Sequence, residues 1–164
     1  MNFDEDSALI ERFLGGDRAS FNVLYERYYD KVFGIARGIL LNSDEAADAV
    51  QEIFTLAYRH LERFDRRARF STWLFRVAVN RSIQEARKHR HSHRFVELSE
   101  ELVGSLGSAP VESGPDEGPI HAALTELSEA DRAVLTLFYW EDLSLQEIGE
   151  SLGCGANADR KGVV

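Results

Sequence analysis

The stretch FSTWLFRVAVNRSIQEARKHRHSHR (residues 70–94) changes character halfway along its length. Its first half carries a wide apolar surface that must be packed, formed by Leu74, Phe75, Val77, Ala78 and Val79. After Ile83 the stretch has no large apolar side chain and becomes a run of Arg, Lys and His. It therefore predicts a helix that is anchored in a core at one end and carries positive charge at the other.

Charge is strongly segregated along the 164-residue chain, whose net charge is -9. Residues 59–94 carry 11 Lys/Arg and 3 Asp/Glu, a net of +8, together with four of the five histidines. Residues 1–58 and 95–164 have net charges of -6 and -11. A charge run is usually a solvated helix face, but an excess of this size favours a binding site for a polyanion.

Apolar residues at three- and four-residue steps predict helices before this stretch. A short helix over 9–14 should end at the two following glycines, and a longer one should cover 21–39. Asn42 can cap the next helix, which continues to about residue 61, and Ser71 or Thr72 can cap the helix of the opening stretch. Because no strand alternation appears, the predicted fold class is all-α.

A segment rich in Gly and Pro separates this bundle from a second helical part. SEELVGSLGSAPVESGPDEGP (99–119) contains all three prolines and predicts a flexible linker. Helices are expected over 120–127 and 129–140, and SLQEIGESLGCG then resembles the first helix and turn of a helix-turn-helix, with Ser144 as its cap. The expected organisation is a helical domain over 1–96, a linker over 97–119 and a small helical domain over 120–164.

Composition excludes several classes of protein. With 44% hydrophobic and 29% charged residues the chain is an ordinary globular protein. Its single Cys154 allows no internal disulfide, which favours the cytoplasm. The acidic N-terminus lacks the pattern of a signal peptide, and no window of about 18 apolar residues predicts a membrane span. No cofactor or metal is expected.

Polar and aromatic side chains share one stripe of the predicted 70–94 helix, formed by Trp73, Arg76, Asn80, Gln84, Arg87 and His91. A surface that reads bases needs this mixture of guanidinium groups, amides and a stacking ring. The preceding loop adds Phe64, Arg66, Arg67 and Arg69. Trp73 is expected to serve partly as core and partly as contact.

Four motifs together resemble a known family: FNVLYERYYDKVFGIA (21–36), DAVQEIFTLAYRHL (48–61), FSTWLFRVAVNRSIQEARKHR (70–90) and LSEADRAVLTLFYWEDLSLQEIGESLG (127–153). The chain is similar to bacterial sigma factors of the sigma-70 family, in the extracytoplasmic-function (ECF) group, from about Leu9 to Asn157. This resemblance implies a non-enzymatic protein with two helical domains, called regions 2 and 4, and a linker that lies along RNA polymerase.

The resemblance also implies roles for particular residues. The second motif would dock on core RNA polymerase through Asp48, Gln51, Glu52 and Thr55, with Phe54 more core than contact. Asn80 would line a pocket for a flipped base of the non-template strand of the promoter -10 element, and Arg81 would hold phosphates. The full set of expected DNA-binding residues is Phe64, Arg66, Arg67, Arg69, Trp73, Arg76, Asn80, Arg81, Gln84, Arg87, Lys88 and Arg90.

The implied function is to direct core RNA polymerase to promoters, of stress or envelope-response genes, under control of an anti-sigma factor. The chain departs from the family at its end, where GCGANADRKGVV replaces a basic recognition helix. Asp159 stands where an apolar anchor is expected, and Gly162 interrupts any helix beyond it. This end predicts that the -35 element is not read by the usual helix.

Three other interpretations stay open at the level of sequence. A metalloenzyme could use His89, His91 and His93, but a spacing of two places neighbours on different helix faces and no Cys is near. A helical adaptor that binds a basic partner would leave the basic, aromatic segment unexplained. A defective sigma factor that cannot read the -35 element is the third. Polymerase-dependent transcription from a defined promoter separates a sigma factor from the metalloenzyme and the adaptor, and footprinting of the holoenzyme at -35 tests the third possibility.

Overall fold

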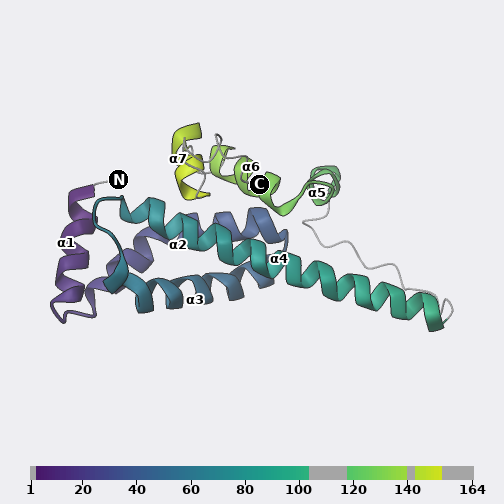
Figure 1. Cartoon of the computed structure of the whole chain (residues 1–164), viewed down its shortest axis with the longest axis horizontal. Coiled ribbons are helices and arrows are strands. Elements are labelled where there is room, and N and C mark those ends of the chain that lie inside the picture. The colour runs from purple at the N-terminus through teal and green to yellow at the C-terminus, as the bar shows by residue number, and fades with distance from the viewer. Residues whose placement is uncertain (1–2, 104–117, 140–142, 153–164) are drawn as a thin grey trace.

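The structure is a computed structural model, and it describes residues 3–103, 118–139 and 143–152, with the side chains of residues 3, 4, 90–103 and 151 excepted (Figure 1). In this part of the chain every regular element is a helix, which confirms the predicted all-α class. The elements are α1 (Phe3–Leu14), α2 (Ser20–Leu40), α3 (Ser43–His60), the short 3-10 helix η1 (Leu61–Arg63), α4 (Phe70–Val103), α5 (Pro119–Thr125), α6 (Glu129–Tyr139) and α7 (Leu145–Ser151).

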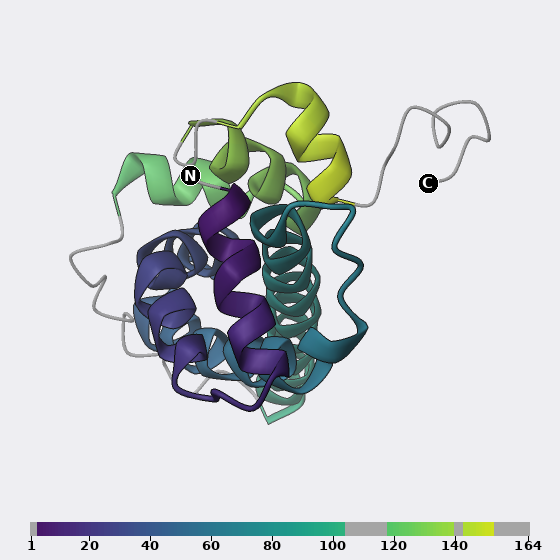
Figure 2. The same cartoon turned by 90° about the vertical axis from the view of Figure 1, so that its left-hand side faces the viewer.

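Helices α2, α3 and α4 run alongside one another, and α1 stands across one end of them (Figures 1 and 2). Each of the three long helices packs against the other two, and α1 packs mainly against α2. The largest fully buried side chains of this bundle include Tyr28, Phe13, Phe75, Ile10, Leu24 and Ile35. The apolar stripes expected from sequence therefore meet in one core.

The start of α3 follows the sequence prediction. The Oδ1 atom of Asn42 accepts a hydrogen bond from the backbone N–H of Glu45 at 2.9 Å, which satisfies one of the unpaired donors of the first turn. The preceding residue, Leu41, ends α2 in the left-handed conformation (φ 59°), and its N–H bonds to the carbonyl of Arg37. A two-residue connection thus reverses the chain between α2 and α3.

The predicted cap of α4 is wrong. The helix begins at Phe70, two residues earlier than a Ser71 cap allows, and the N–H of Trp73 donates to the carbonyl of Arg69. Phe70 is buried, and its ring packs against that of Tyr28 at 5.5 Å between centroids. Burial of this ring on the helix places both hydroxyl residues inside the first turn rather than before it.

The second helical part packs directly onto the first. Helix α6 lies across α2 and touches α4, and α7 lies against α4 (Figure 2). The buried side chains Ala133, Leu137, Leu143 and Ile148 belong to the same apolar cluster as the bundle core. As expected, Ser144 caps its helix, because its hydroxyl accepts the N–H of Glu147 at 3.2 Å.

Helix α4 continues to Val103, so it extends seven residues into the segment 97–119 that was predicted to be a linker. The residues on which the -35 prediction rests, among them Asp159 and Gly162, lie outside the described part of the chain. Within the described residues, none of the helices combines the length and the apolar character that crossing a membrane requires.

Candidate functional site

Two adjoining cavities open on the face where α3 and α4 meet. One, of about 360 Å³, is lined by Gln51, Glu52, Thr55, Leu56, Arg59 and Arg81. The other, of about 220 Å³, is lined by Leu56, His60, Trp73, Val77, Asn80, Arg81 and Gln84. Because Leu56 and Arg81 line both cavities, the face predicted to bind polymerase and the pocket predicted to receive a base share a wall.

The polar face of α3 is open to solvent, as its predicted role requires. Asp48, Gln51, Glu52 and Thr55 are all exposed, whereas Phe54 is buried at 4% exposure and belongs to the core, as predicted. The amide of Gln51 lies 3.5 Å from the hydroxyl of Tyr25 on α2. This polar face is therefore not part of the bundle core, and its side chains are accessible to a partner.

The smaller cavity brings together an amide and an aromatic ring. Trp73 is half-buried, and the rings of Phe64 and Phe70 hold it at 5.3 and 5.9 Å between centroids. Two helical turns further along α4, Asn80 is exposed at the cavity. A stacking surface beside a hydrogen-bonding edge is the arrangement that can hold an unstacked base.

Sequence reasoning missed three residues of this cavity: Leu56 and His60 from α3, and Val77 of α4, which it assigned to the core. The spacing of four between Leu56 and His60 puts both on one side of α3. That spacing was available in the sequence, but it does not reveal that this side of α3 faces Asn80 and Trp73. The structure supplies this placement through the packing of α3 on α4.

Arg81 is held by carboxylates rather than left open. Its Nε atom donates to Oε2 of Glu52 at 2.5 Å, and its Nη2 atom lies 2.7 Å from Oε1 of Glu85. Its Nη1 atom also donates to Oε1 of Gln84 at 3.3 Å. Before Arg81 could hold a phosphate, as the sequence predicts, its guanidinium would have to leave at least one of these partners.

The other predicted DNA-binding cations do not converge on the cavity. Arg66 pairs with Glu11 on α1 at 3.0 Å. Arg76 donates to the backbone carbonyl of Glu150 on α7 at 2.5 and 3.2 Å. Arg67, Arg69, Arg87 and Lys88 are exposed, and no ion pair is formed by these four within the described residues. The side chain of Arg90 lies outside the described part.

Of the three alternating histidines that were considered as metal ligands, His89 has its side chain in the described part of the chain. His89 lies 3.5 Å from Glu45 and 3.9 Å from Glu85, so it belongs to the same polar network as Arg81. The side chains of His91 and His93 lie outside the described part. Among the described residues, no three His, Cys, Asp or Glu side chains cluster in a way that could hold a metal ion.

Comparison with known proteins matches both halves of the chain. The family model described as Sigma-70 region 2 matches residues 24–92, and that described as Sigma-70, region 4 matches residues 117–158. The RNA polymerase sigma-H factor of Pseudomonas aeruginosa is 31% identical, over 92% of this chain and 84% of that protein. The ECF RNA polymerase sigma factor SigW of Bacillus subtilis is 34% identical, over 84% and 79%.

The fold has a counterpart among solved structures. The structure of CnrH in complex with the cytosolic domain of CnrY superposes with a TM-score of 0.65 at 22% identity, covering 95% of this chain and 88% of that one. Two family models in the expected order, together with relatives above 30% identity over most of their length, confirm the resemblance seen in the sequence. The chain belongs to the sigma-70 family of RNA polymerase sigma factors, in its ECF group.

Proposed function

We propose that this sigma factor docks on core RNA polymerase through the polar face of α3 and opens promoter DNA at the cavity between α3 and α4. As an ECF sigma factor the chain binds core polymerase and directs transcription initiation at promoters, and it is not an enzyme. The observation that carries the proposal is the arrangement of two cavities with a shared wall. It supports the assignment of both tasks to adjoining surfaces of α3 and α4.

Promoter opening at this site needs no catalytic group. Unpairing and unstacking one base costs a few kcal/mol. Stacking on an aromatic ring such as Trp73 contributes about 1–3 kcal/mol per base, and an edge contact from Asn80 adds selectivity. The exposed cations Arg87 and Lys88 lie further along α4, where they add a salt-dependent attraction for backbone phosphates.

The organisation of the chain and its partners form part of the same proposal. The chain would be divided into region 2 (1–96), a connection (97–119) and region 4 (120–164). Region 4 would not read the -35 element by the usual helix. We infer that an anti-sigma protein regulates this chain and that the chain directs transcription of stress or envelope-response genes. We infer also that it acts in the cytoplasm. Support comes from the ECF relatives and from CnrH, which was solved in complex with a cytosolic domain of another protein.

Exchanging Gln51 for Ala and Glu52 for Lys tests the polymerase face. We expect at least a tenfold loss of affinity for core polymerase in a titration, because the exchange reverses charge at the centre of the docking surface. Helix content should stay unchanged, since both side chains are exposed.

Two controls separate docking from folding. Glu26→Lys makes the same charge change at an exposed position on α2 and should bind core polymerase normally. Arg81→Met breaks the same ion pair that Glu52→Lys breaks, but leaves the face of α3 intact. Unaltered affinity of the doubly exchanged chain would contradict the proposed docking face.

A further inference from the structure

We propose that Arg81 is a positioning residue, which fixes the amide of Gln84 so that the cavity between α3 and α4 prefers a base with an exocyclic carbonyl, guanine or thymine. The inference rests on the proposed function, because it names the class of base that this cavity would receive. It concerns the selectivity of the cavity and not the strength of DNA binding as a whole.

Two carboxylates hold the guanidinium of Arg81, one on each helix that lines the cavity. Its Nε atom donates to Oε2 of Glu52 on α3 at 2.5 Å, and its Nη2 atom contacts the same oxygen. Nη2 also lies 2.7 Å from Oε1 of Glu85 on α4. The side chains of Arg81 and Glu85 are 29% and 19% exposed, so water and salt screen this pair less than they would at an open surface. The guanidinium therefore has a defined place in the wall of the cavity.

The remaining terminal nitrogen of this guanidinium orients Gln84. Nη1 of Arg81 donates to Oε1 of Gln84 at 3.3 Å, three residues further along α4. A guanidinium has five N–H donors and no acceptor, so the amide of Gln84 can turn only its oxygen toward Arg81. The oxygen and nitrogen of a glutamine amide are assigned from such partners. What Gln84 then offers to a ligand is its NH2 group, which donates.

The polar groups of the cavity whose character is fixed are all donors. Asn80 and Gln84 are four residues apart and share the face of α4 that lines the cavity. Trp73 and Arg81 carry N–H donors and no acceptor, and none of the described residues in the lining is a carboxylate. Asn80 and His60 can each donate or accept. A base edge that presents an acceptor is therefore better matched than one that presents an amino group.

The exocyclic groups of the bases divide them accordingly. Guanine and thymine carry a carbonyl oxygen, which accepts, where adenine and cytosine carry an amino group, which donates. A glutamine amide that can use both its atoms pairs best with adenine, because it donates to N7 and accepts from the amino group. With its oxygen held by Arg81, Gln84 loses this bidentate pairing. The expected preference is thus the reverse of the one that a glutamine alone would predict.

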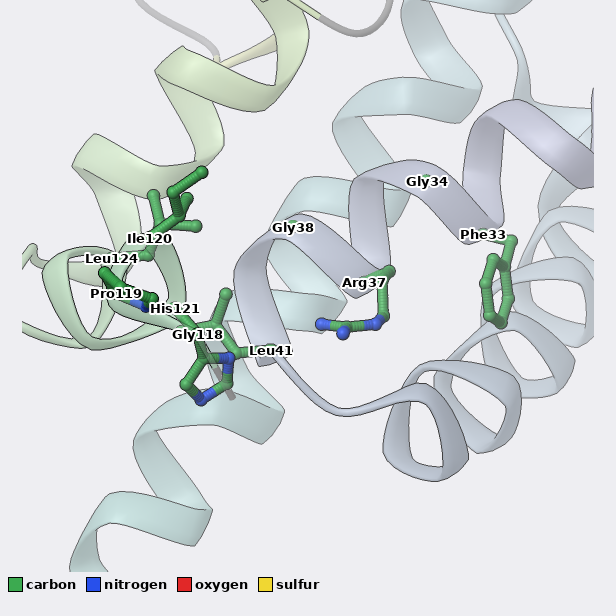
Figure 3. Close-up of a pocket in the computed structure, with 10 residues that line it drawn as sticks. All are labelled: Phe33, Gly34, Arg37, Gly38, Leu41, Gly118, Pro119, Ile120, His121 and Leu124. Atoms are coloured by element: carbon green, nitrogen blue, oxygen red, sulfur yellow. The ribbon is translucent and has the colours of Figure 1, made fainter. Parts of the chain in front are cut away.

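A larger cavity elsewhere in the molecule lacks the groups that such selectivity needs. It has a volume of about 470 Å³ and lies between α2 and α5, with Phe33 and Ile120 among its apolar lining (Figure 3). Its lining also includes Arg37 and His121, but none of the described residues that line it is Asn or Gln. A base preference that depends on Gln84 therefore reports on the cavity between α3 and α4.

Binding of oligonucleotides that differ in one base tests the preference. The full chain bound to core polymerase would be titrated with single-stranded -10 oligonucleotides, in which each position carries each of the four bases in turn. The position to compare is the one at which Asn80→Ala changes discrimination. There we expect guanine or thymine to bind at least about fivefold more tightly than adenine or cytosine, which is the size of one edge contact.

A double-mutant cycle separates orientation of Gln84 by Arg81 from direct contact of Arg81 with the base. Arg81→Met should raise the relative affinity for adenine, because the amide of Gln84 can then turn either way. In a chain that also carries Gln84→Ala, Arg81→Met should leave the relative affinity for adenine unchanged. Arg87→Met is the matched control, since it removes the same charge from an exposed site on α4 and should weaken binding to all four bases equally.

The outcomes separate this inference from the proposed function. If no oligonucleotide binds, the proposed function is wrong and the inference falls with it. If the oligonucleotides bind but adenine or cytosine is as good as guanine or thymine, the inference is wrong and the proposed function stands. If Arg81→Met shifts the preference equally with and without Gln84, or leaves it unchanged, the positioning role of Arg81 is refuted. Should Arg81→Met lose helix content, the preference of the original chain and its loss in Gln84→Ala, whose side chain is exposed, still decide the question.

Discussion

The hydroxyl of Tyr28 shows how a single polar group is fitted into the core. Tyr28 is fully buried and its hydroxyl donates to a carboxylate oxygen of Asp6, which is 5% exposed. Arg27 donates to the other oxygen of Asp6 at 2.6 Å. Burial, and then the hydrogen bond to Asp6, raises the pKa of Tyr28 above its ordinary value of 10. These three groups tie α1 to α2.

Removing this hydroxyl tests its contribution to stability. Tyr28→Phe should lower the free energy of unfolding by about 1–3 kcal/mol, because the buried carboxylate of Asp6 loses one of its donors. Urea unfolding at neutral pH measures the change. Tyr25→Phe is the matched control, since the hydroxyl of Tyr25 makes only a long contact at an exposed position. Equal losses in both variants would contradict the role of the buried pair.

The same hydroxyl predicts a dependence on pH. Because the pKa of Tyr28 is higher in the folded chain than in the unfolded chain, its contribution is fully present below pH 10 and is lost as pH rises above 10. Comparing urea unfolding at pH 9 and at about pH 10.5 should show a smaller loss of stability in Tyr28→Phe than in the original chain. An identical loss in the two proteins would argue against the shifted pKa.

We expect Asn80 to contribute selectivity for one base rather than general affinity for DNA. Asn80→Ala should reduce discrimination at one position of the -10 element by about 1–3 kcal/mol, since an amide reads a base edge. Arg87→Ala or Lys88→Ala should weaken binding to every sequence and lower the salt slope by about 0.7–0.9 each. Holoenzyme binding to four oligonucleotides that differ at this base gives both readouts. An equal loss on all four for Asn80→Ala would exclude the pocket.

At the scale of the helices, capping residues were mostly predictable from sequence. Asn42 and Ser144 act as expected because both signals are local: a short polar side chain meets an unpaired N–H three residues on. The start of α4 was not predictable in this way, since it is decided by burial of Phe70 against distant rings. The side of α3 that faces Asn80 was not predictable either, because it also depends on how the helices pack.

The cap of α3 gives a prediction for a whole element. Asn42→Ala should lower the free energy of unfolding by about 1 kcal/mol, because the first turn of the helix loses its acceptor. Asn42→Asp keeps the oxygen and should retain stability. Thermal unfolding followed by circular dichroism distinguishes the two. Were Asn42→Ala as stable as Asn42→Asp, the hydrogen bond to Glu45 would contribute nothing to the fold.

At the scale of the whole molecule, sequence predicted two helical parts but not their contact. The spacing of Leu137 and Ala133 predicts only the apolar face of a helix, and the neighbouring sequence does not indicate that this face packs on α2. The contact needs the missing side chain at Gly38 to leave room for Thr136, and these two residues are nearly a hundred positions apart. A glycine inside a helical pattern indicates that another element packs closely there, but it does not identify that element.

The shared core predicts how the molecule unfolds. In the original chain the two halves should melt in one transition, since the buried cluster runs through both. Gly38→Ala should separate the transition into two, with the second half melting first because it loses its support. Calorimetry resolves the two cases. One transition in Gly38→Ala, with unchanged midpoint, would mean that the close approach of Gly38 and Thr136 does not contribute to the coupling of the two halves.

The bond between Arg132 and the carbonyl of Ile39 spans 93 positions, and this has a consequence for the order of synthesis. All contacts among α1, α2 and α3 can form while α6 is still inside the ribosome, because domains fold as units from the N-terminus during translation. Every newly made molecule therefore exists first as a bundle whose α2 lacks its cover at Ile39, and the second half of the chain docks onto a core that has already formed.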